Sequence, residues 1–327
     1  MKNFAKFAAY NILWIIVFLL LFEAALRVFW KMSPLQGEIY RASANKTLRY
    51  ELKPGADTVY EGQPVRINSD GFRDREYALQ KPPHTYRIVV LGDSVAFGRF
   101  NLPEDNLARR LEARLNSACP GRSFEVLNMG VEGYNTVQEA ELLKAKALKY
   151  APDLVIVYYS LNDADYPEYY FEKNFLNRHF LSARYIQYQR KKIMVRKDRK
   201  LKGVKTDEEG INYLYRTQCW DYTKKTLLEM GDTCAAGGAR MALLVFPEMS
   251  EQVRDFQDGF PFWHIIEKLE SLKHPNILVI TPVREFARRG LKKDDLRNWT
   301  YPNLKATDII VEYALGLMRE NGMASCD

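Results

Sequence analysis

From Tyr86 to the carboxyl end of the chain, short apolar runs alternate with segments of helical periodicity. The apolar runs read RIVVL, FEVLN, DLVIVYY, ALLVF and ILVI, and the helical segments are NLARRLEARLN, VQEAELLKAKALKY and residues 219–236, 263–272 and 306–319. Strands that alternate with helices predict a parallel sheet with helices on both faces. The alternation breaks between residues 165 and 215, so we expect one α/β domain that carries an insertion there.

The amino-terminal segment is apolar. Residues 7–22 read FAAYNILWIIVFLLLF, and AALRVFW extends the stretch beyond Glu23. This length approaches the roughly 20 residues that span a bilayer, and bulky residues stand where a cleaved signal peptide would carry small ones. We therefore predict one uncleaved transmembrane helix, with a cleaved signal peptide and a buried core helix as alternatives. Lys2 and Lys6 favour a cytoplasmic amino terminus, which puts the domain outside the cytoplasm, on the periplasmic side if the source is bacterial.

The composition is that of a globular protein, with 47% hydrophobic and 27% charged residues, which excludes a disordered chain. Residues 31–85 are polar and contain many prolines and glycines, which predicts a tether followed by short strands and turns. The expected organisation is a transmembrane anchor at 1–30, the tether and short strands at 31–85, and the α/β domain at 86–327 with its insertion at 165–215.

The positive charge of the chain is concentrated in one segment. The formal net charge is +7, with 48 basic and 41 acidic residues, yet residues 173–205 alone hold 12 basic residues and one acid. The rest of the chain therefore has 36 basic and 40 acidic residues. With no recognised nucleic-acid-binding motif, we expect no nucleic acid as a partner. The basic segment, with its interleaved apolar residues, predicts contact with anionic lipid or acidic polysaccharide, or else a solvated lid.

The cysteines are few and widely spaced. The chain has four: Cys119, Cys219, Cys234 and Cys326. They form no CxxC pair, so we expect no structural metal site. A disulfide between Cys219 and Cys234 remains open if the compartment is oxidising.

Three polar signals follow three successive predicted strands. The first strand leads into Gly92-Asp93-Ser94-Val95, the second ends before Gly130, and the third ends before Asn162. A serine in a tight turn after a strand exposes its hydroxyl near backbone donors. Taken alone, Gly130 fits a helix-entry turn and Asn162 fits a helix cap. The carboxyl ends of parallel strands meet at the ligand-binding edge of a sheet, so together the three predict one site.

The order and context of these blocks resemble the SGNH (GDSL) hydrolase family, from about Tyr86 to Asp163. The segment NSDGFR at residues 68–73 also looks like one found in membrane-tethered members. The resemblance implies a flavodoxin-like three-layer α/β/α fold and no cofactor. It also implies hydrolysis or transfer of esters, often acetyl groups on carbohydrate, through an acyl-enzyme. Ser94 would be the nucleophile, and Ser94, Gly130 and Asn162 would form the oxyanion hole.

The last family block departs from the pattern. Members carry an aspartate and, three residues later, a histidine, whereas this chain has Asn298 and Tyr301 there. A serine hydroxyl needs a base to become a good nucleophile, and a phenol with a pKa of about 10 is protonated at neutral pH. Both members of the base dyad are therefore absent.

Other residues are alternative candidates for the base. His84 and His274 precede strands and are expected at the opposite edge of the sheet, while His179 and His264 follow strands. Three aspartates are further candidates by proximity: Asp163, Asp165 and Asp308.

Two hypotheses about function follow. The chain is an esterase or acyltransferase that acts through Ser94 on an acylated extracytoplasmic glycan or lipid. Alternatively, it is a catalytically inactive carbohydrate-binding or scaffold subunit, because Tyr301 and Asn298 stand at the base positions.

Overall fold

The computed structural model describes residues 2–29, 39–165, 203–249, 255–257, 259–297 and 300–326, with scattered residues between 180 and 200. These residues form two compact units. The first contains residues 1–38 and 169–205, and the second contains residues 39–168 and 206–327.

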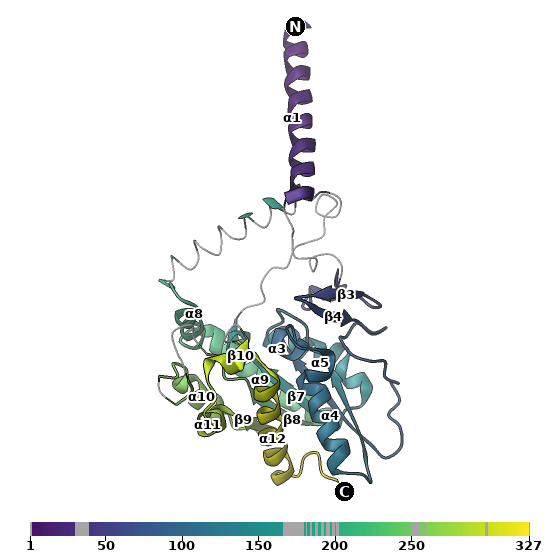
Figure 1. Cartoon of the computed structure of the whole chain (residues 1–327), viewed down its shortest axis with the longest axis vertical. Coiled ribbons are helices and arrows are strands. Elements are labelled where there is room, and N and C mark those ends of the chain that lie inside the picture. The colour runs from purple at the N-terminus through teal and green to yellow at the C-terminus, as the bar shows by residue number, and fades with distance from the viewer. Residues whose placement is uncertain are drawn as a thin grey trace. The chain divides into compact units, whose positions relative to one another are not determined.

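The second unit is built on a five-stranded sheet (Figure 1). The strand order is β6-β5-β7-β8-β9, and every neighbouring pair is parallel. The strands are β5 (Thr85–Gly92), β6 (Ser123–Asn128), β7 (Leu154–Tyr159), β8 (Arg240–Val245) and β9 (Ile277–Ile280). These are the five apolar runs of the sequence, so the predicted parallel sheet is confirmed. Their branched and aromatic side chains suit a sheet that is covered on both faces.

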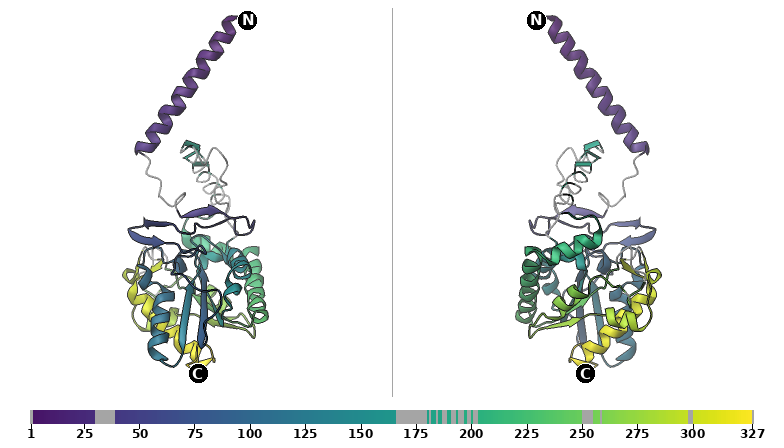
Figure 2. Two further views of the ribbon diagram at one scale, coloured as in Figure 1. Left: turned by 90° about the vertical axis from the view of Figure 1, so that its right-hand side faces the viewer. Right: turned by 90° about the vertical axis from the view of Figure 1, so that its left-hand side faces the viewer.

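Helices cover the two faces of this sheet. Helix α4 (Leu107–Ala118) packs against α12 (Leu304–Glu320), and α5 (Thr136–Ala145) packs against α9 (Gln218–Ala236). Figure 2 shows α4 and α12 on one side of the strands and α9 on the other. The described part of this unit also contains the helices α3 (Ser94–Phe97), α8 (Asp207–Tyr215), α10 (Trp263–Glu270) and α11 (Val283–Arg288). The three-layer α/β/α prediction is therefore confirmed.

Sequence signals account for where the long helices begin. The side chain of Asn106 accepts a hydrogen bond from the Arg109 amide at 2.9 Å and caps α4, and Asn303 caps α12 through Ala306 in the same way. Leu107, Leu111 and Leu115 recur every four residues and are buried in α4. Capping satisfies amides that the first helical turn leaves without partners.

Short elements surround the sheet. Two hairpins precede it, β1 (Tyr40–Ala42) with β2 (Tyr50–Leu52) and β3 (Asp57–Tyr60) with β4 (Gln63–Arg66). A third pairs β10 (Leu296–Arg297) with β11 (Tyr301–Pro302). The 3₁₀ turns are η1 (Pro103–Asp105), η2 (Ala147–Tyr150), η3 (Leu161–Ala164) and η4 (Lys293–Asp295).

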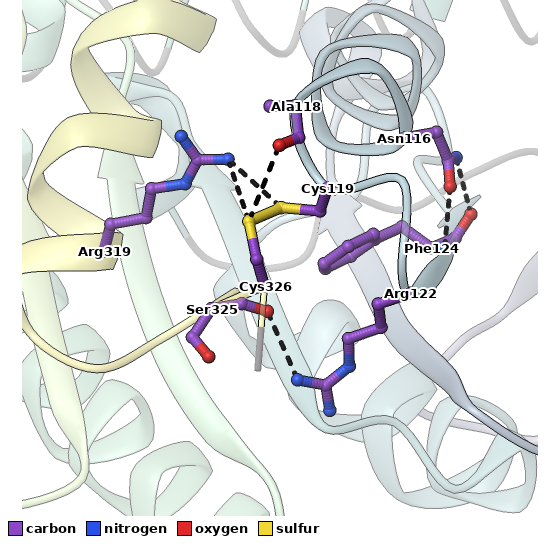
Figure 3. Close-up of a disulfide and its surroundings, with 8 residues drawn as sticks. All are labelled: Asn116, Ala118, Cys119, Arg122, Phe124, Arg319, Ser325 and Cys326. Carbon is purple, nitrogen blue, oxygen red and sulfur yellow. Dashed lines mark hydrogen bonds between the residues drawn. A yellow bond between two sulfur atoms is a disulfide. The ribbon is translucent and has the colours of Figure 1, made fainter.

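The cysteines pair in a way that the sequence did not predict. Cys119 at the end of α4 forms a disulfide with Cys326, 207 residues away in sequence (Figure 3). Cys219 and Cys234 are buried and free, so the Cys219–Cys234 disulfide is excluded. Both lie on α9, and at 1.5 Å per residue their backbones are about 22 Å apart, far beyond the reach of a disulfide.

The first unit contains α1 (Lys2–Phe29), which is long and apolar enough to cross a membrane over Ala9–Val28. A signal sequence near the amino terminus meets the same criterion. Within this unit, the Glu23 side chain accepts a hydrogen bond from the Ser182 amide at 2.8 Å, and the ring of Phe22 contacts that of Tyr185. Much of the predicted basic segment, including Lys191, Lys192 and Arg196, lies outside the described residues.

Candidate active site

The turn after β5 presents Ser94 at the carboxyl edge of the sheet. Gly92 ends the strand, and a Cβ there would lie 2.7 Å from the Tyr158 carbonyl oxygen, so the close approach of β7 requires glycine. Asp93 then caps α3 by accepting a hydrogen bond from the Val95 amide at 2.8 Å. This turn leaves Ser94 half-buried at the start of the short helix.

Two polar side chains contact the hydroxyl of Ser94. Its Oγ lies 3.0 Å from the phenolic oxygen of Tyr301 and 3.3 Å from Oδ2 of Asp93. Tyr301 comes from β11, and its ring meets the ring of Phe100 edge to face at 4.7 Å between centroids. Tyr301, predicted as one of the two residues in place of the base dyad, therefore lies beside the serine. The other, Asn298, is outside the described residues.

Asp93 is almost completely shielded from water, with 2% of its surface exposed. Its Oδ1 accepts hydrogen bonds from the Val95 amide and, at 3.1 Å, from the hydroxyl of Ser160. Burial raises the pKa of Asp93 to about 6, although these donors and Ser94 lower it. The carboxyl group thus titrates close to neutral pH.

Three more carboxyl groups are buried around Asp93. Glu139 in α5, Asp163 in η3 and Glu248 after β8 are each at most 5% exposed. Burial raises the pKa of Glu139 and Asp163 well above their usual values and that of Glu248 to about 8, and the charge of Asp93 adds to each shift. Burial thus favours the protonated form of each group, because an unpaired charge is costly inside a protein.

Arg99 supplies the positive charge near Tyr301. Its guanidinium forms ion pairs with Glu61 at 2.7 Å and with Glu132 at 2.8 Å, and it lies over the ring of Phe100. Burial raises the pKa of Tyr301 and the charge of Asp93 adds to the rise, while Ser94 and Arg99 lower it to a smaller extent. Tyr301 is therefore a neutral phenol at pH 7, with a cation nearby that favours its ionised form.

The two other predicted oxyanion donors, Gly130 and Asn162, differ from each other in their surroundings. The Gly130 amide donates to the side-chain oxygen of Asn128 at 3.0 Å, so this donor is engaged within its own loop. A Cβ on Gly130 would lie 2.6 Å from the carbonyl carbon of Ala96 and would also collide with the Phe97 amide, so Gly130 packs directly against α3. Asn162 is exposed on η3.

The three histidines that the structure describes form no hydrogen bond with Ser94, whose hydroxyl contacts Asp93 and Tyr301. His274 pairs with Asp232 at 3.0 Å and stands before β9, at the opposite edge of the sheet, as expected. His84 stands before β5. His264, at the start of α10, is half-buried near Arg216 and Lys268, and burial followed by these cations lowers its pKa.

The remaining candidates are also accounted for. His179 lies outside the described residues. Asp308 pairs with Arg110 at 2.7 Å on the face between α12 and α4. Asp163 accepts from the Ser160 amide at 2.7 Å, and the Asp165 carbonyl accepts from Asn135. No group of three or more His, Cys, Asp or Glu side chains is placed to hold a metal ion in the part of the chain that the structure describes.

The NSDGFR segment braces the serine turn. Arg73 is 2% exposed, and its guanidinium donates to the carbonyl of Phe97, which ends α3, and to those of Gly98 and Asn101 just after it. The side-chain oxygen of Asn68 accepts from the Phe72 amide at 2.9 Å and holds the segment in its turn. The sequence alone predicts no role for Arg73, Arg99, Glu139 or Glu248. Only for Arg73 did it contain a signal, because the arginine belongs to a segment already noted for its resemblance.

Comparison with known proteins gives a likeness of fold. No protein-family model and no curated protein matches the chain. Among solved structures, TesA matches at 14% identity and a TM-score of 0.42, over 72% of this chain and 98% of TesA. A Desulfitobacterium hafniense DCB-2 protein described as lipolytic and of the G-D-S-L family matches at 16% identity and a TM-score of 0.39, over 71% and 98%.

A third solved structure is a two-domain esterase, CEX, which is active on acetylated mannans. It matches at 12% identity and a TM-score of 0.43, over 72% of this chain and 49% of CEX. Identities and scores at this level carry no argument about activity or substrate.

Proposed function

We propose that this chain is a serine-dependent esterase or acyltransferase, with Ser94 as the nucleophile. The observation that carries the proposal is the position of the Ser94 hydroxyl between the Asp93 carboxyl group and the Tyr301 phenol, at the carboxyl edge of a parallel sheet. Ligands of such sheets bind at this edge. A serine hydroxyl beside a buried carboxyl group has a neighbour that can activate it as a nucleophile.

The proposal is tested with a fluorophosphonate probe and with 4-nitrophenyl esters. We expect the probe to label the wild-type chain at Ser94 and the wild-type chain to hydrolyse the ester. Ser94→Ala should lose both properties, whereas Ser117→Ala, which alters an exposed serine on α4, should keep them. Labelling that persists in Ser94→Ala would contradict the proposal.

The second candidate is an inactive binding subunit. Two observations favour it: the Gly130 amide is already engaged by Asn128, and the neutral Tyr301 cannot act as a base in the ground state. A chain that shows neither labelling nor ester hydrolysis, yet binds a glycan, would support this candidate over the enzyme.

We further propose that α1 anchors the domain outside the cytoplasm. The helix is apolar over Ala9–Val28, and the Cys119–Cys326 disulfide fits an oxidising compartment. The substrate class that suits this location is an acylated extracytoplasmic glycan or lipid. The full-length chain should sediment with membranes, and deletion of residues 1–32 should release a soluble folded protein. A soluble full-length chain in the absence of detergent would contradict the anchor.

The basic segment at 173–205 is proposed to contact anionic lipid or acidic polysaccharide. Arg190, Lys197 and Lys200 are exposed, and the same unit contains the contact between Phe22 of α1 and Tyr185. Neutralising Arg190, Lys191, Lys192, Arg196 and Lys197 should weaken binding to anionic vesicles. Binding by the wild-type chain should also fall as salt rises, because salt screens exposed charges.

A further inference from the structure

The hydrogen bonds around Ser94 can be assigned a direction by counting protons. An ionised Asp93 can only accept, so the 3.3 Å contact is a hydrogen bond from the Ser94 hydroxyl to Oδ2. A serine hydroxyl has one proton, and this bond uses it. In the 3.0 Å contact, the Tyr301 phenol must therefore donate to Ser94 Oγ. The result is a chain of two hydrogen bonds that runs from Tyr301 through Ser94 to Asp93.

Asp93 is held in the orientation that a base requires. Its Oδ1 is occupied by the Val95 amide and the Ser160 hydroxyl, which fixes the plane of the carboxyl group. The other oxygen, Oδ2, is the one that faces Ser94. The 3.3 Å contact is slightly longer than the roughly 2.6–3.2 Å of a working general base. Such contacts shorten when substrate binds, so the geometry fits a base in the free enzyme.

We propose that Asp93 is the general base that takes the Ser94 proton and that Tyr301 is the general acid that protonates the leaving group. This assignment rests on the proposed function. It names the two groups that act as base and acid in place of the missing histidine. Asp93 touches the reacting oxygen, and so does Tyr301, which places both among the catalytic residues.

The charges around Asp93 allow it to act near neutral pH. The titratable groups that face it are carboxyl groups and phenols: Glu132, Glu139, Asp163, Glu248, Tyr158 and Tyr301. Burial raises the pKa of Glu139 and Asp163 and raises that of Glu248 to about 8, which favours their protonated forms. The charge of Glu132 is paired with Arg99. With a pKa of about 6, Asp93 is mostly ionised at pH 7. A base with a pKa close to the working pH is the most effective one.

Arg99 makes it easier for Tyr301 to act as the acid. A phenol that gives up its proton becomes an anion, and the nearby guanidinium lowers the cost of that charge. The ion pairs with Glu61 and Glu132 hold Arg99 in place. Arg99 is therefore a positioning and charge-balancing residue.

Protons and bonds balance over one turnover. In acylation, the Ser94 proton moves to Asp93, Oγ bonds to the acyl carbon, and the ester C–O bond breaks as the alkoxide takes the Tyr301 proton. In deacylation, the Tyr301 phenolate takes a proton from water and the resulting hydroxide bonds to the acyl carbon. The bond from that carbon to Oγ breaks, and Asp93 returns its proton to Ser94. An alcohol in place of water gives acyl transfer.

The base is tested by the pH dependence of kcat/KM on 4-nitrophenyl acetate, using the full-length chain in detergent. The wild-type value should reach a plateau above about pH 6 and fall about tenfold per unit below it. Asp93→Asn, which keeps an oxygen for Val95 and Ser160, should lower the plateau about 10²–10⁴-fold. Asp308→Asn makes the same chemical change at the ion pair with Arg110 and should retain wild-type activity.

A third variant distinguishes catalysis from structure. Ser160→Ala removes a hydrogen bond that lowers the pKa of Asp93, so the acidic limb of the profile should move to higher pH. A wild-type profile that is flat between about pH 5 and 8, or an Asp93→Asn chain as active as Asp308→Asn, would overturn the assignment of the base. The pH profile is measured on the wild-type chain alone. The assignment of the base can therefore still be refuted if Asp93→Asn fails to fold.

The acid is tested by comparing leaving groups. An alkoxide needs a proton to leave, whereas 4-nitrophenolate leaves as an anion. Tyr301→Phe should lower kcat/KM about 10²–10⁴-fold on an alkyl acetate and less than about tenfold on 4-nitrophenyl acetate. Equal losses on both esters would overturn the assignment of the acid. Absence of Ser94-dependent activity in the wild-type chain would refute the proposed function itself, which separates the two failures.

Discussion

At the scale of single residues, the guanidinium of Arg73 stabilises the turn that carries Ser94. It is buried, it donates to carbonyls on both sides of Gly98, and it lies over the ring of Phe97. Burial lowers the pKa of Arg73 to about 10, so it keeps its charge at neutral pH. Arg73→Met removes every one of these donors and leaves buried carbonyls without partners.

We expect Arg73→Met to lower the free energy of unfolding by at least about 1.5–3 kcal/mol, because each unsatisfied buried carbonyl carries a desolvation cost. Arg73→Lys should cost less, since an ammonium group replaces some of the donors. Chemical denaturation measures the loss, and the rate of phosphonate labelling reports whether Ser94 is still presented. Arg114→Lys, at an exposed site on α4, is the control and should match wild type.

Residue by residue, the sequence predicts this site only where a motif fixes the spacing. Ser94 and Tyr301 were recognised from block order, and the structure brings their hydroxyls together. The roles of Glu139 and Glu248 could not be recognised, because a glutamate within a helix or loop is normally solvated. Only the packing of α5 and of the segment after β8 against the sheet buries them.

At the scale of elements, α3 and the loop after β6 pack without space between them. A Cβ on Gly130 would meet the backbone of Ala96 and Phe97. Gly130→Ala should therefore displace α3, with a cost of about 1–3 kcal/mol in unfolding free energy and slower labelling of Ser94. Gly316→Ala is the matched control. Nothing lies within 4 Å of its added Cβ in α12, and it should gain about 0.5–1 kcal/mol.

The disulfide joins the end of α4 to the segment after α12. Cys326→Ser opens a loop that closes over 207 residues of separation, so we expect a loss of about 2–5 kcal/mol in the free energy of unfolding. Reduction of the wild-type chain should produce the same loss, and the variant should not respond to reductant. A variant that still shifts its denaturation midpoint on reduction would show that another thiol is involved.

At the scale of the whole molecule, the alternation of apolar runs with helical segments was enough to predict the sheet. Its strand order and the disulfide were not predictable, because both depend on contacts between distant parts of the chain. Cys119 and Cys326 are brought together only when α4 and α12 pack on the same face of the sheet. The Cys219–Cys234 alternative failed because both residues belong to one continuous helix.

The buried carboxyl groups make the stability of the whole fold depend on pH. Glu248 has a pKa of about 8 in the folded chain and about 4.3 when unfolded, so between these values the native state holds the extra proton. The free energy of unfolding should therefore be highest in mild acid and fall as pH rises to 8, by up to about 1.4 kcal/mol per pH unit for one such group. Glu139 and Asp163 act in the same direction.

Urea denaturation at pH 5, 6.5 and 8 measures how steeply the free energy of unfolding falls with pH. Glu248→Gln should flatten it and stabilise the chain at pH 8, whereas Glu320→Gln, at an exposed site, should leave it unchanged. A wild-type stability that rises over this range would contradict the burial of protonated carboxyl groups.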